Sequence, residues 1–551
     1  MSQSLPSPVL RPVVKGKFIF VGDQKLYIKG VTYGTFRPSQ EGLLFPAPEV
    51  VAQDFKVMAE NGINALRTYT IPPRWLLNLA WENNLWVMVG LPWEQHITFL
   101  DDRRRRQRLE QRVRSEVQSC GGHPAILGFA IGNEIPASIV RWYGAPRVQS
   151  FLKRLYRIVK AVDPACLVTY VNYPSTEYLL TPFVDFYCFN VYLESRERLA
   201  DYLARLQNLA EDKPLVMAEI GLDSQRNGEA KQAEVLEWQI RTIFDGGCTG
   251  CFIFAWTDEW YRGGAEIEDW DFGLTSRDRQ SKPALQAVGQ SFCSGPFPPD
   301  RILPFISVAI CSYNGSPTIR DTLNALQKLE YLHFETIVVD DGSTDGVGEI
   351  ARAYPGVRVI VHATNQGLSA ARNTALAAAR GEIIAYIDDD AYPDPHWLHY
   401  LAISFSQADW AGIGGPNLPP PEDGPIAACV ANAPGGPIHV LISDREAEHI
   451  PGCNMAFWVD RLRAINGFDP RYRAAGDDVD ICWRLQNQGW KIGFSPAALV
   501  WHHRRNSVKA YWKQPAILIL AKSYPTARNR GMVMPSERAK RARAVEKGRF
   551  V

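Results

Sequence analysis

Three consecutive carboxylates, Asp388, Asp389 and Asp390, stand at the end of an apolar run that begins at Gly381. An apolar run of this length, bounded by glycine and acidic residues, is typical of a buried strand in a parallel sheet. Such a strand delivers several negative charges to the carboxyl edge of the sheet, where open α/β sheets bind their ligands. A hard cation with oxygen ligands, Mg²⁺ or Mn²⁺, would balance these charges. The alternative is a solvated acidic turn.

Two glutamates in the first half of the chain hold a similar position. Glu134 follows Asn133 at the end of the apolar run 126–132, and Glu219 stands near the end of the run 214–221. A pair of carboxyl groups on facing strands suits the cleavage of a glycosidic bond, because one group protonates the leaving oxygen while the other attacks the sugar carbon. The alternative is a pair of glutamates without chemistry, in a fold that only binds glycans.

The elements that must position these glutamates repeat along residues 17–288. A hairpin around Gly22 and Asp23 comes first, and apolar runs followed by polar side chains then alternate with helical stretches. Eight such units in just under 300 residues predict a (β/α)8 TIM barrel with its active site at the strand ends. The predicted strands are residues 31–35, 62–69, 85–92, 126–134, 167–172, 185–192, 214–221 and 250–257.

The acidic strand belongs to a second alternating pattern. Apolar runs that include residues 306–312, 334–340 and 381–387 predict an α/β domain with a mostly parallel, Rossmann-like sheet. Residues 411–416 contain three glycines and are expected to form a loop. The proline-rich stretch 295–304 is the predicted linker, because prolines cannot continue a helix and stiffen the connection. The predicted organisation is a barrel over residues 1–294, the linker over 295–304, the second domain over 305–515 and a basic tail over 516–551.

Composition argues against several classes of protein. The chain of 551 residues has a net charge of +1, which argues against nucleic acid as the main partner. Its start lacks the basic and apolar segments of a secretory signal, and no apolar run approaches the roughly 20 residues of a membrane-spanning helix. The ten cysteines lack a framework spacing, so reduced thiols are expected. We therefore expect a cytoplasmic protein without an integral membrane segment. Its tail from Arg528 is either solvated or in peripheral contact with anionic lipid.

Four motifs in the second half stand in the order found in one known family. They are Ser-Tyr-Asn (312–314), Val-Asp-Asp-Gly-Ser-Thr-Asp (339–345), Asn-x-Gly-x-x-x-Ala-Arg-Asn (365–373) and Asp-x-Asp (388–390). From about Ile306 to Trp512 the chain resembles the family 2 inverting glycosyltransferases of the GT-A fold. The resemblance implies a UDP-sugar donor, a glycan or other acceptor, and Mn²⁺ or Mg²⁺ held by Asp388 and Asp390. It also implies substrate contacts for Ser312, Tyr313, Asp340, Asp341, Arg372, Asp389 and Asp477.

Two later motifs extend this resemblance. Asp477 and Asp478 match the family's Glu-Asp pair at a helix start, with Asp477 in place of Glu, so that Asp478 matches the general base. A helix N-terminus favours the ionised form that a base needs, although a plain helix cap is the alternative. His502 and His503 match a late histidine that contacts the metal or the diphosphate in relatives, and a surface pair is the alternative. The Gln-x-x-Arg-Trp motif of processive synthases does not occur, so non-processive transfer is expected.

The first half resembles the catalytic barrel of the clan A retaining β-glycosidases. The similarity is greatest to family 2, through His-Pro-Ala-Ile (123–126), Gly-Asn-Glu (132–134) and Phe-Gly-Leu-Thr-Ser-Arg-Asp (272–278). The resemblance implies that Glu134 is the acid/base at the end of strand four and Glu219 the nucleophile at the end of strand seven. It covers the barrel alone, because the chain has no room for the β-sandwich domains that precede the barrel in that family. The matching substrate-cradling positions are Arg67, Asn133, Tyr192 and Trp256.

Together these patterns predict a bifunctional carbohydrate-active enzyme. One half would transfer a sugar from a UDP-sugar to an acceptor with inversion, forming a β-linkage, and the barrel would hydrolyse or transglycosylate β-glycosides with retention. Three alternatives stay open: an inactive glycan-binding barrel beside an active transferase, a silent transferase beside a hydrolase, or two scaffolds in a polysaccharide-assembly complex. Assays of metal-dependent nucleotide-sugar turnover and of aryl β-glycoside hydrolysis discriminate among them.

Overall fold

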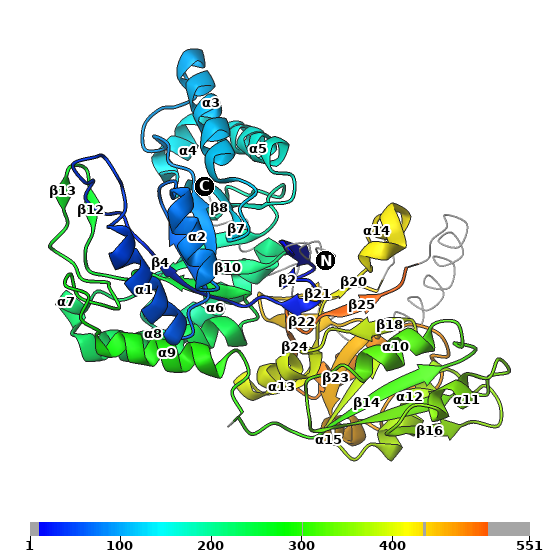
Figure 1. Ribbon diagram of the computed structural model, residues 1–551. Helices are drawn as coiled ribbons and strands as arrows, with labels where there is room; N and C mark the ends of the chain where they lie inside the picture. The colour runs from blue at the N-terminus through cyan, green and yellow to red at the C-terminus, as the bar shows by residue number, and fades with distance from the viewer. Residues whose placement is uncertain (1–9, 300, 433–436, 505–551) are drawn as a thin grey trace, which may run out of the picture. The chain divides into compact units, whose positions relative to one another are not determined.

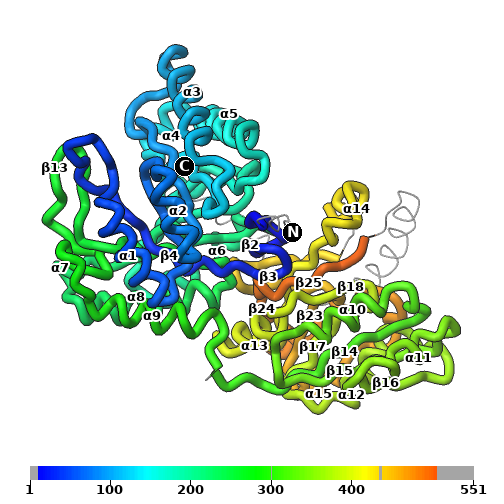
Figure 2. Tube along the Cα trace, in the orientation of Figure 1, coloured from blue at the N-terminus to red at the C-terminus, as the bar shows by residue number. Residues whose placement is uncertain are grey.

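The chain folds into two compact units, Met1–Pro299 and Asp300–Val551 (Figure 1, Figure 2). The computed structural model describes residues 10–299, 301–432 and 437–504. The division lies within the predicted linker 295–304, and the predicted basic tail 516–551 lies outside the described residues. None of the helices in these three ranges is long and apolar enough to cross a membrane.

The first unit is built on a closed barrel of eight parallel strands, in the order β10-β11-β4-β5-β6-β7-β8-β9. Each barrel strand overlaps one of the eight apolar runs, so the predicted (β/α)8 barrel is confirmed. The strands are β4 (Ile28–Thr32), β5 (Ala65–Thr68), β6 (Trp86–Gly90), β7 (Ile126–Asn133), β8 (Leu167–Asn172), β9 (Tyr187–Asn190), β10 (Leu215–Ile220) and β11 (Gly250–Ile253).

Helices between the strands cover the outside of the barrel. They are amphipathic: α5 buries Val148, Phe151, Leu152, Leu155, Ile158 and Val159, which recur at the spacing of one helix face. The helices are α1 (Pro48–Glu60), α2 (Arg74–Glu82), α3 (Arg103–Cys120), α4 (Ala137–Tyr143), α5 (Ala145–Val162), α6 (Arg196–Ala210), α7 (Ser224–Asn227), α8 (Glu229–Asp245) and α9 (Pro283–Ser294).

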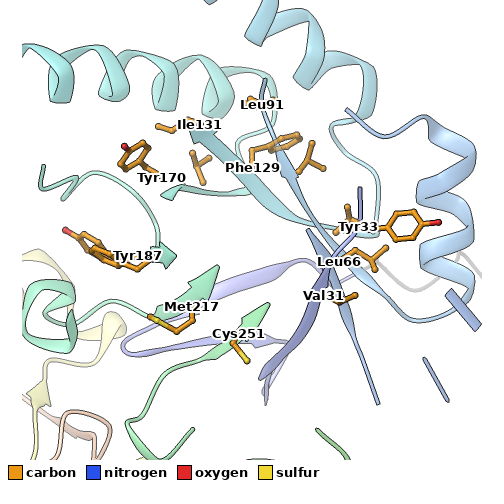
Figure 3. Close-up of a cluster of buried hydrophobic side chains, with 14 of the residues drawn as sticks. Val31, Tyr33, Leu66, Leu91, Phe129, Ile131, Tyr170, Tyr187, Met217 and Cys251 are labelled. Carbon is orange, nitrogen blue, oxygen red and sulfur yellow. The ribbon is translucent and has the colours of Figure 1, made fainter. Parts of the chain in front are cut away.

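Alternation along the strands gives the barrel two cores. Leu66 and Met217 belong to the cluster between strands and helices, part of which Figure 3 shows. Their neighbours Ala65 and Val216 belong to a second cluster inside the barrel. The predicted amino-terminal hairpin forms the sheet of β1 (Pro12–Lys15), β2 (Phe18–Val21) and β3 (Gln24–Lys25). Ile19 of this sheet packs into the inner cluster, which fixes the hairpin to the barrel.

The second unit contains a nine-stranded sheet in the order β16-β15-β14-β17-β23-β19-β24-β22-β21. The first four strands are parallel, and β23 then runs antiparallel to both of its neighbours. The predicted α/β domain is confirmed, with a sheet that is mixed and largely parallel. The strands are β14 (Ile306–Ser312), β15 (Phe334–Asp340), β16 (Val357–Val361), β17 (Ile383–Ile387), β19 (Trp410–Gly414), β21 (Val440–Leu441), β22 (Glu446–His449), β23 (Asn454–Trp458) and β24 (Lys491–Phe494).

The remaining elements of this unit border the large sheet. A small sheet has the order β18-β25-β20, and α12 packs against β14 and β15. The small strands are β18 (Ala391–Pro393), β20 (Asn417–Leu418) and β25 (Val500–His502). The helices are α10 (Ile319–Leu326), α11 (Val347–Arg352), α12 (Leu368–Ala378), α13 (Trp397–Gln407), α14 (Gly424–Ala431), α15 (Val459–Ala464) and α16 (Asp477–Asn487).

The glycine-rich stretch 411–416 differs from the expectation of a loop, because its first four residues belong to β19. A Cβ on Gly412 would lie 2.3 Å from the ring of Phe457, and one on Gly414 would lie 2.5 Å from Ile450. Both glycines therefore serve close packing within the sheet rather than a turn.

Candidate functional site

Bulges in two barrel strands aim the predicted catalytic glutamates. The pairing of β7 with β8 shifts register between Ala130 and Asn133, immediately before Glu134. The pairing of β10 with β9 shifts between Met217 and Glu219. Such bulges redirect side chains and are frequent beside active sites. Glu134 also has a φ of 51°, in the left-handed region that residues with a side chain rarely adopt, so its backbone is held in a strained conformation.

The carboxylate of Glu219 is enclosed by four donors from two strand ends, those of β5 and β9. Its Oε1 accepts from Arg67 Nη1 (2.7 Å), from the Tyr69 hydroxyl (2.5 Å) and from Asn190 Nδ2 (2.8 Å). Its Oε2 accepts from the Tyr192 hydroxyl at 2.6 Å. The Arg67 side chain is only 2% exposed, so its ion pair with Glu219 is buried. These contacts hold the carboxyl group of Glu219 in a fixed orientation, as a nucleophile requires.

Asn190 joins the two glutamates and limits their separation. Its Nδ2 donates to Glu134 Oε1 at 2.9 Å as well as to Glu219 Oε1 at 2.8 Å. Because one nitrogen bonds both oxygens, they lie less than about 6 Å apart, which falls in the range of retaining rather than inverting glycosidases. The predicted close spacing of the two carboxyl groups is thus present.

The protonation states around Glu219 complement this geometry. Burial, reinforced by the negative charge of Glu219, raises the pKa of the Glu134 carboxyl above its usual value. Burial also raises the pKa of the Tyr69 and Tyr192 hydroxyls well above the usual value, so both keep the protons that they donate to Glu219. The site therefore pairs a carboxyl group of raised pKa, Glu134, with a carboxyl group that accepts four hydrogen bonds, Glu219.

Asn133 and Gln95 extend the hydrogen-bond network around the two glutamates. Asn133 Oδ1 accepts from Arg67 Nη2 at 2.7 Å and from Asn190 Nδ2 at 3.2 Å, while its backbone N–H donates to Gln95 Oε1 at 2.9 Å. The structure thus brings together Arg67, Asn133, Glu134, Tyr192 and Glu219, as the sequence predicted.

A cavity of about 460 Å³ opens above these groups, with aromatic rings from the loops on its walls. Trp256, predicted to cradle substrate, does not line it: this side chain is 1% exposed and belongs to the core between strands and helices. Strand β11 ends at Ile253, earlier than predicted, and the chain beyond it turns Trp256 into the core. The cavity is lined by Thr35, Arg67, Thr68, Tyr69, Gly90, Leu91, Pro92, Trp93, Gln95, His96, Ala130, Gly132, Asn133, Glu134, Glu219, Phe254, Trp260, Tyr261, Arg262, Gly263 and Trp270.

Sequence reasoning missed Tyr69 and Asn190 as functional residues. Both contact Glu219, and Asn190 contacts Glu134 as well. In the structure each stands at or just beyond the carboxyl end of its strand, β5 for Tyr69 and β9 for Asn190, and this position is the signal that could have identified them.

In the second unit, the acidic triplet lies beyond the end of β17 as predicted. Asp390 Oδ1 pairs with His502 Nε2 at 3.1 Å, and Asp388 Oδ1 lies 3.5 Å from Arg372 Nη2. Burial alone would raise the pKa of Asp390, but the hydrogen bond and charge of His502 lower it below its usual value. Burial raises the pKa of Asp388. A surplus of carboxylate thus gathers at this strand end.

Asp389 has a different environment from its two neighbours. It forms a short hydrogen bond with the Ser312 hydroxyl at the end of β14, and burial raises its pKa to about 7. Ser312 and Asp389, both predicted to contact substrate, are therefore bonded to each other. Tyr313 beside them is 54% exposed and free to contact a ligand.

Arg372 of α12 is a buried cation that connects the acidic strand end to α16. It forms an ion pair with Asp477 and donates to the backbone oxygen of Gly452 at 3.2 Å. Both side chains of the ion pair are 3% exposed. Asp477 is thus committed to Arg372, which fixes the start of α16 and with it the neighbouring Asp478.

Both carboxyl oxygens of Asp478, the predicted general base, accept hydrogen bonds from backbone N–H groups. Its Oδ2 accepts from the N–H of Gly452 at 3.2 Å and its Oδ1 from the N–H of Val479 at 2.9 Å. Burial raises its pKa, with Arg372 opposing the shift. A carboxylate with a raised pKa is a stronger base, which suits the removal of a proton from a hydroxyl.

The predicted substrate contacts Asp340 and Asp341 have structural partners. Asp341 accepts from the N–H groups of Gln366 and Gly367, both at 2.8 Å, and contacts His362 Nδ1 at 2.6 Å. Both oxygens of this buried carboxylate are occupied, so Asp341 holds the loop before α12 rather than a ligand. Asp340 Oδ1 accepts from the N–H of Ser343 at 2.9 Å.

The histidines behave differently from each other. Consecutive residues of an extended chain point to opposite sides, and the ring of His503 accordingly contacts Asp423 (2.9 Å) instead of the acidic triplet. His502 Nδ1 lies 2.7 Å from Arg504 Nη1. On its other side, His502 Nε2 faces Asp390 Oδ1 at 3.1 Å. His502 as arranged here supports Asp390, and the side chain of His503 lies apart from the predicted metal site.

The donor chemistry of this strand end fits a divalent cation. One donor atom each of Asp388, Cys453 and His502 lie within 4.8 Å of one another, and Asp390 adjoins His502. Carboxylate oxygens suit Mn²⁺ and Mg²⁺, whereas a thiol and an imidazole nearby are softer groups that Mg²⁺ does not favour. Asp388 and Asp390 are therefore the residues best suited to hold the cation.

Comparison with known proteins agrees with both units. Residues 13–293, just over half of the chain, match "Glycosyl hydrolases family 2, TIM barrel domain". Residues 307–416 match "Glycosyl transferase family 2", and residues 383–516 match "Glycosyl transferase family group 2".

Individual relatives cover parts of the chain. It is 31% identical over 211 residues to glycosyltransferase AglE of Haloferax volcanii, covering 37% of this chain and 68% of that protein. It is 30% identical over 218 residues to the pre-mycofactocin glycosyltransferase of Mycobacterium tuberculosis, covering 37% and 44%. A β-galacturonidase structure from Eisenbergiella tayi gives a TM-score of 0.45 at 21% identity, over 52% of this chain and 54% of that one. The chain thus spans only about half the length of the latter two proteins. It belongs to glycosyl hydrolase family 2 through its barrel and to glycosyltransferase family 2 through its second unit.

Proposed function

We propose that the second unit transfers a sugar from a nucleotide-sugar donor, with UDP-sugars as the first candidates, to a hydroxyl acceptor with inversion. The observation that carries this proposal is the surplus of carboxylate beyond β17, close to the buried Arg372 and the base candidate Asp478. Such a surplus matches a site where a cation and a diphosphate bind together. The names of the relatives, glycosyltransferases of two organisms, support the reaction class.

The residues divide the work of transfer as follows. Asp388 and Asp390 would hold Mn²⁺ or Mg²⁺, which supplies positive charge for the departing diphosphate. Asp478 removes the proton of the acceptor hydroxyl as that oxygen attacks the sugar carbon from the face opposite the diphosphate. One displacement converts an α-linked donor into a β-linked product. Arg372 holds Asp477 and so keeps the start of α16 in place.

A screen of UDP-sugars tests the transferase. The protein is incubated with each donor and Mn²⁺ or Mg²⁺, and release of UDP is measured with and without chelator. Chelator-sensitive turnover of at least one donor is expected. If no UDP-sugar or other nucleotide sugar is turned over, transfer by this unit is excluded.

We propose in addition that the barrel cleaves or rearranges β-glycosides with retention. The observation that carries this proposal is the single amide of Asn190 that bonds both Glu134 and Glu219. Glu219, held by four donors, attacks the sugar carbon while Glu134 gives its proton to the leaving oxygen. Glu134 then takes a proton from water or from an acceptor hydroxyl, whose oxygen bonds to the sugar carbon and displaces the carboxylate of Glu219. The strained backbone of Glu134 and the cavity above both groups favour this activity over glycan binding alone.

Aryl β-glycosides test the barrel. A panel of 4-nitrophenyl β-glycosides is assayed, and the anomeric configuration of the first product is followed by NMR. Release of nitrophenol with a β-configured first product is expected. Hydrolysis that gives an α-configured first product would contradict retention, and no hydrolysis across the panel would leave the barrel as a glycan-binding module.

A further inference from the structure

A second concavity adjoins the catalytic cavity of the barrel. It has a volume of about 330 Å³ and is called here the side depression. It shares two wall residues with the catalytic cavity, Phe254 and Trp270, whose rings are stacked at 5.4 Å with an interplanar angle of 11°. The two cavities therefore adjoin each other at this aromatic pair. The side depression is lined by Tyr192, Asp223, Arg226, Phe254, Trp270 and Phe272.

Aromatic rings form most of this lining. Phe272 packs edge-on to Trp270 at 5.1 Å, and Tyr192 lies 5.8 Å from Phe272 and 6.3 Å from Phe254. The four rings brace one another, so they form a preformed surface. A preformed, mainly apolar cavity with a few fixed polar groups is the usual form of a small-ligand site. Flat rings of this kind suit the C–H faces of a sugar.

The polar part of the lining has unused bonding capacity. Asp223 is 6% exposed, and its Oδ1 accepts from the N–H groups of Gln225 (3.0 Å) and Asp271 (2.8 Å). Its Oδ2 is buried and accepts no hydrogen bond within the described part of the chain, with only an ion pair to Arg226 Nε at 3.3 Å. The side chain of Arg226 is 75% exposed and keeps further N–H donors free. The exposed N–H donors of Arg226, oriented by its ion pair with Asp223 and lying beside aromatic rings, suit the hydroxyl groups of a sugar.

The side depression lies on the side of the predicted nucleophile. Tyr192, which lines it, donates to Glu219 Oε2 at 2.6 Å. The lining comes from the segments that follow β9, β10 and β11, whereas Glu134 follows β7. Because the leaving group departs where Glu134 protonates its oxygen, a ligand in the side depression is attached to the retained sugar.

From these contacts we infer that the side depression binds a second sugar unit, joined to the sugar that Glu219 attacks. The barrel would then act on oligosaccharides or polysaccharides with at least two units on the retained side. This inference rests on the proposed β-glycosidase activity. Glycan chains, rather than glycosides of a single sugar, would be its substrates.

Matched pairs of aryl β-glycosides provide the test. The 4-nitrophenyl β-monosides of glucose, mannose, galactose and xylose are compared with the corresponding β-1,4-linked biosides. The expected result is that kcat/KM for at least one bioside exceeds that for its monoside by about tenfold or more, from two or more added hydrogen bonds and the stacking contact. Equal constants for every active pair would overturn the inference while leaving the hydrolase proposal intact.

Two substitutions assign the preference to the side depression. Arg226→Ala should reduce the ratio of bioside to monoside toward one without changing monoside hydrolysis, since Arg226 does not line the catalytic cavity. Phe272→Ala should reduce the same ratio through loss of the stacking surface. Arg205→Ala is the control, because Arg205 is a half-exposed arginine on α6, paired with Glu177, that lines neither cavity. A bioside preference that survives both substitutions would overturn the inference.

Binding separates failure of the inference from failure of the proposed activity. If the barrel hydrolyses none of the panel, tryptophan fluorescence is titrated with cello-, manno-, galacto- and xylo-oligosaccharides, since Trp270 lines the side depression. Saturable binding that Arg226→Ala weakens and Arg205→Ala does not would keep the side depression as an oligosaccharide site without hydrolysis. Absence of saturable binding would overturn it.

Discussion

The two sites gather carboxylates at the same place, the carboxyl ends of parallel strands, but balance their charges in opposite ways. In the barrel, Glu219 is surrounded by donors from the protein itself, and burial together with the charge of Glu219 raises the pKa of Glu134. Around the end of β17, carboxylates outnumber the nearby cations: the carboxyl groups are those of Asp388, Asp389, Asp390, Asp477 and Asp478, against the side chains of Arg372, His502 and Arg504.

The difference separates a site whose carboxyl groups are matched by donors from one that carries a surplus of carboxyl groups. Neutral amide and phenol donors can organise a carboxylate pair without attracting a metal ion. A cluster with excess negative charge is stable only when its carboxyl groups take up protons or bind positive charge. We therefore expect the barrel's activity to be indifferent to chelators and the transferase's activity to depend on metal.

The largest effect is expected from removing the proposed nucleophile of the barrel, Glu219. Glu219→Gln keeps the shape of the side chain but cannot form the covalent intermediate, so aryl β-glycoside hydrolysis should fall by about 10⁴-fold or more. The initial rate of nitrophenol release measures this loss. Metal-dependent UDP release should be unchanged in the same variant. Retention of more than a few per cent of hydrolysis would remove Glu219 from its role.

Asp390→Asn tests the second site of the comparison, the carboxylate cluster beyond β17. It removes one charge from the cluster that needs a cation, so transfer should fall by about 10³-fold and UDP-sugar binding in the presence of Mn²⁺ should weaken. UDP release and calorimetric titration of the donor measure the two effects.

The matched control for this variant is Asp423→Asn. This aspartate contacts the ring of His503 and the backbone N–H of Arg504 rather than the triplet, and its substitution should leave transfer close to the wild-type rate. Aryl glycoside hydrolysis should be normal in both variants. Unchanged metal-dependent turnover in Asp390→Asn would contradict the cation site.

Asp478→Asn distinguishes two roles within the second unit. One is removal of the acceptor's proton, and the other is balance of the charges that bind the donor and the metal. Transfer should fall by about 10²- to 10⁴-fold, while donor and metal binding stay near normal. Single-turnover transfer and donor titration check the two parts. Asp480→Asn, which affects an aspartate of the same helix paired with Arg484, is the control. A collapse of donor affinity in Asp478→Asn would show that this carboxylate binds rather than deprotonates.

The smallest expected effect is a pH dependence of the barrel. Because the pKa of Glu134 is raised, its protonated form persists above the usual carboxyl range, and hydrolysis that needs this proton is lost as the pH rises through that raised pKa. The pH profile of kcat/KM should show this alkaline limb. Glu134→Gln should remove the limb and slow substrates with poor leaving groups more than those with good ones. An unchanged profile in the variant would assign the limb to another group.

Hydrophobic patterning was sufficient to predict the eight barrel strands and the strands β14, β15 and β17 of the second unit, with the residues at their ends. Glu134 and Glu219 could be located because apolar runs of barrel strands end in polar groups, and the acidic triplet stands out for the same reason. Strand ends bring sequence-distant residues together by topology alone. Arg67, Asn133 and Tyr192 could be predicted to join the pair on this basis, through the resemblance to a known barrel.

The failures come from interactions that a single sequence does not encode locally. The position of the Trp256 side chain depends on where β11 ends. The chain after Ile253 no longer alternates between two faces as a strand does. The carboxylate of Asp341 accepts hydrogen bonds from backbone N–H groups some 25 residues further along the chain, and no spacing in the sequence predicts these contacts. Asn190 is uncharged, so nothing distinguishes it from other polar residues near strand ends until both glutamates are seen to bond it.

The shared environment of Glu134 and Glu219 has a consequence for the order of events in the proposed reaction. The negative charge of Glu219 helps to raise the pKa of Glu134, and that charge disappears when Glu219 becomes part of a glycosyl ester. Formation of the intermediate therefore lowers the pKa of Glu134 at the moment when its task changes from giving a proton to taking one. The charge of Glu219 thus controls the pKa of Glu134. Each half-reaction therefore brings Glu134 to the protonation state that the next half-reaction needs.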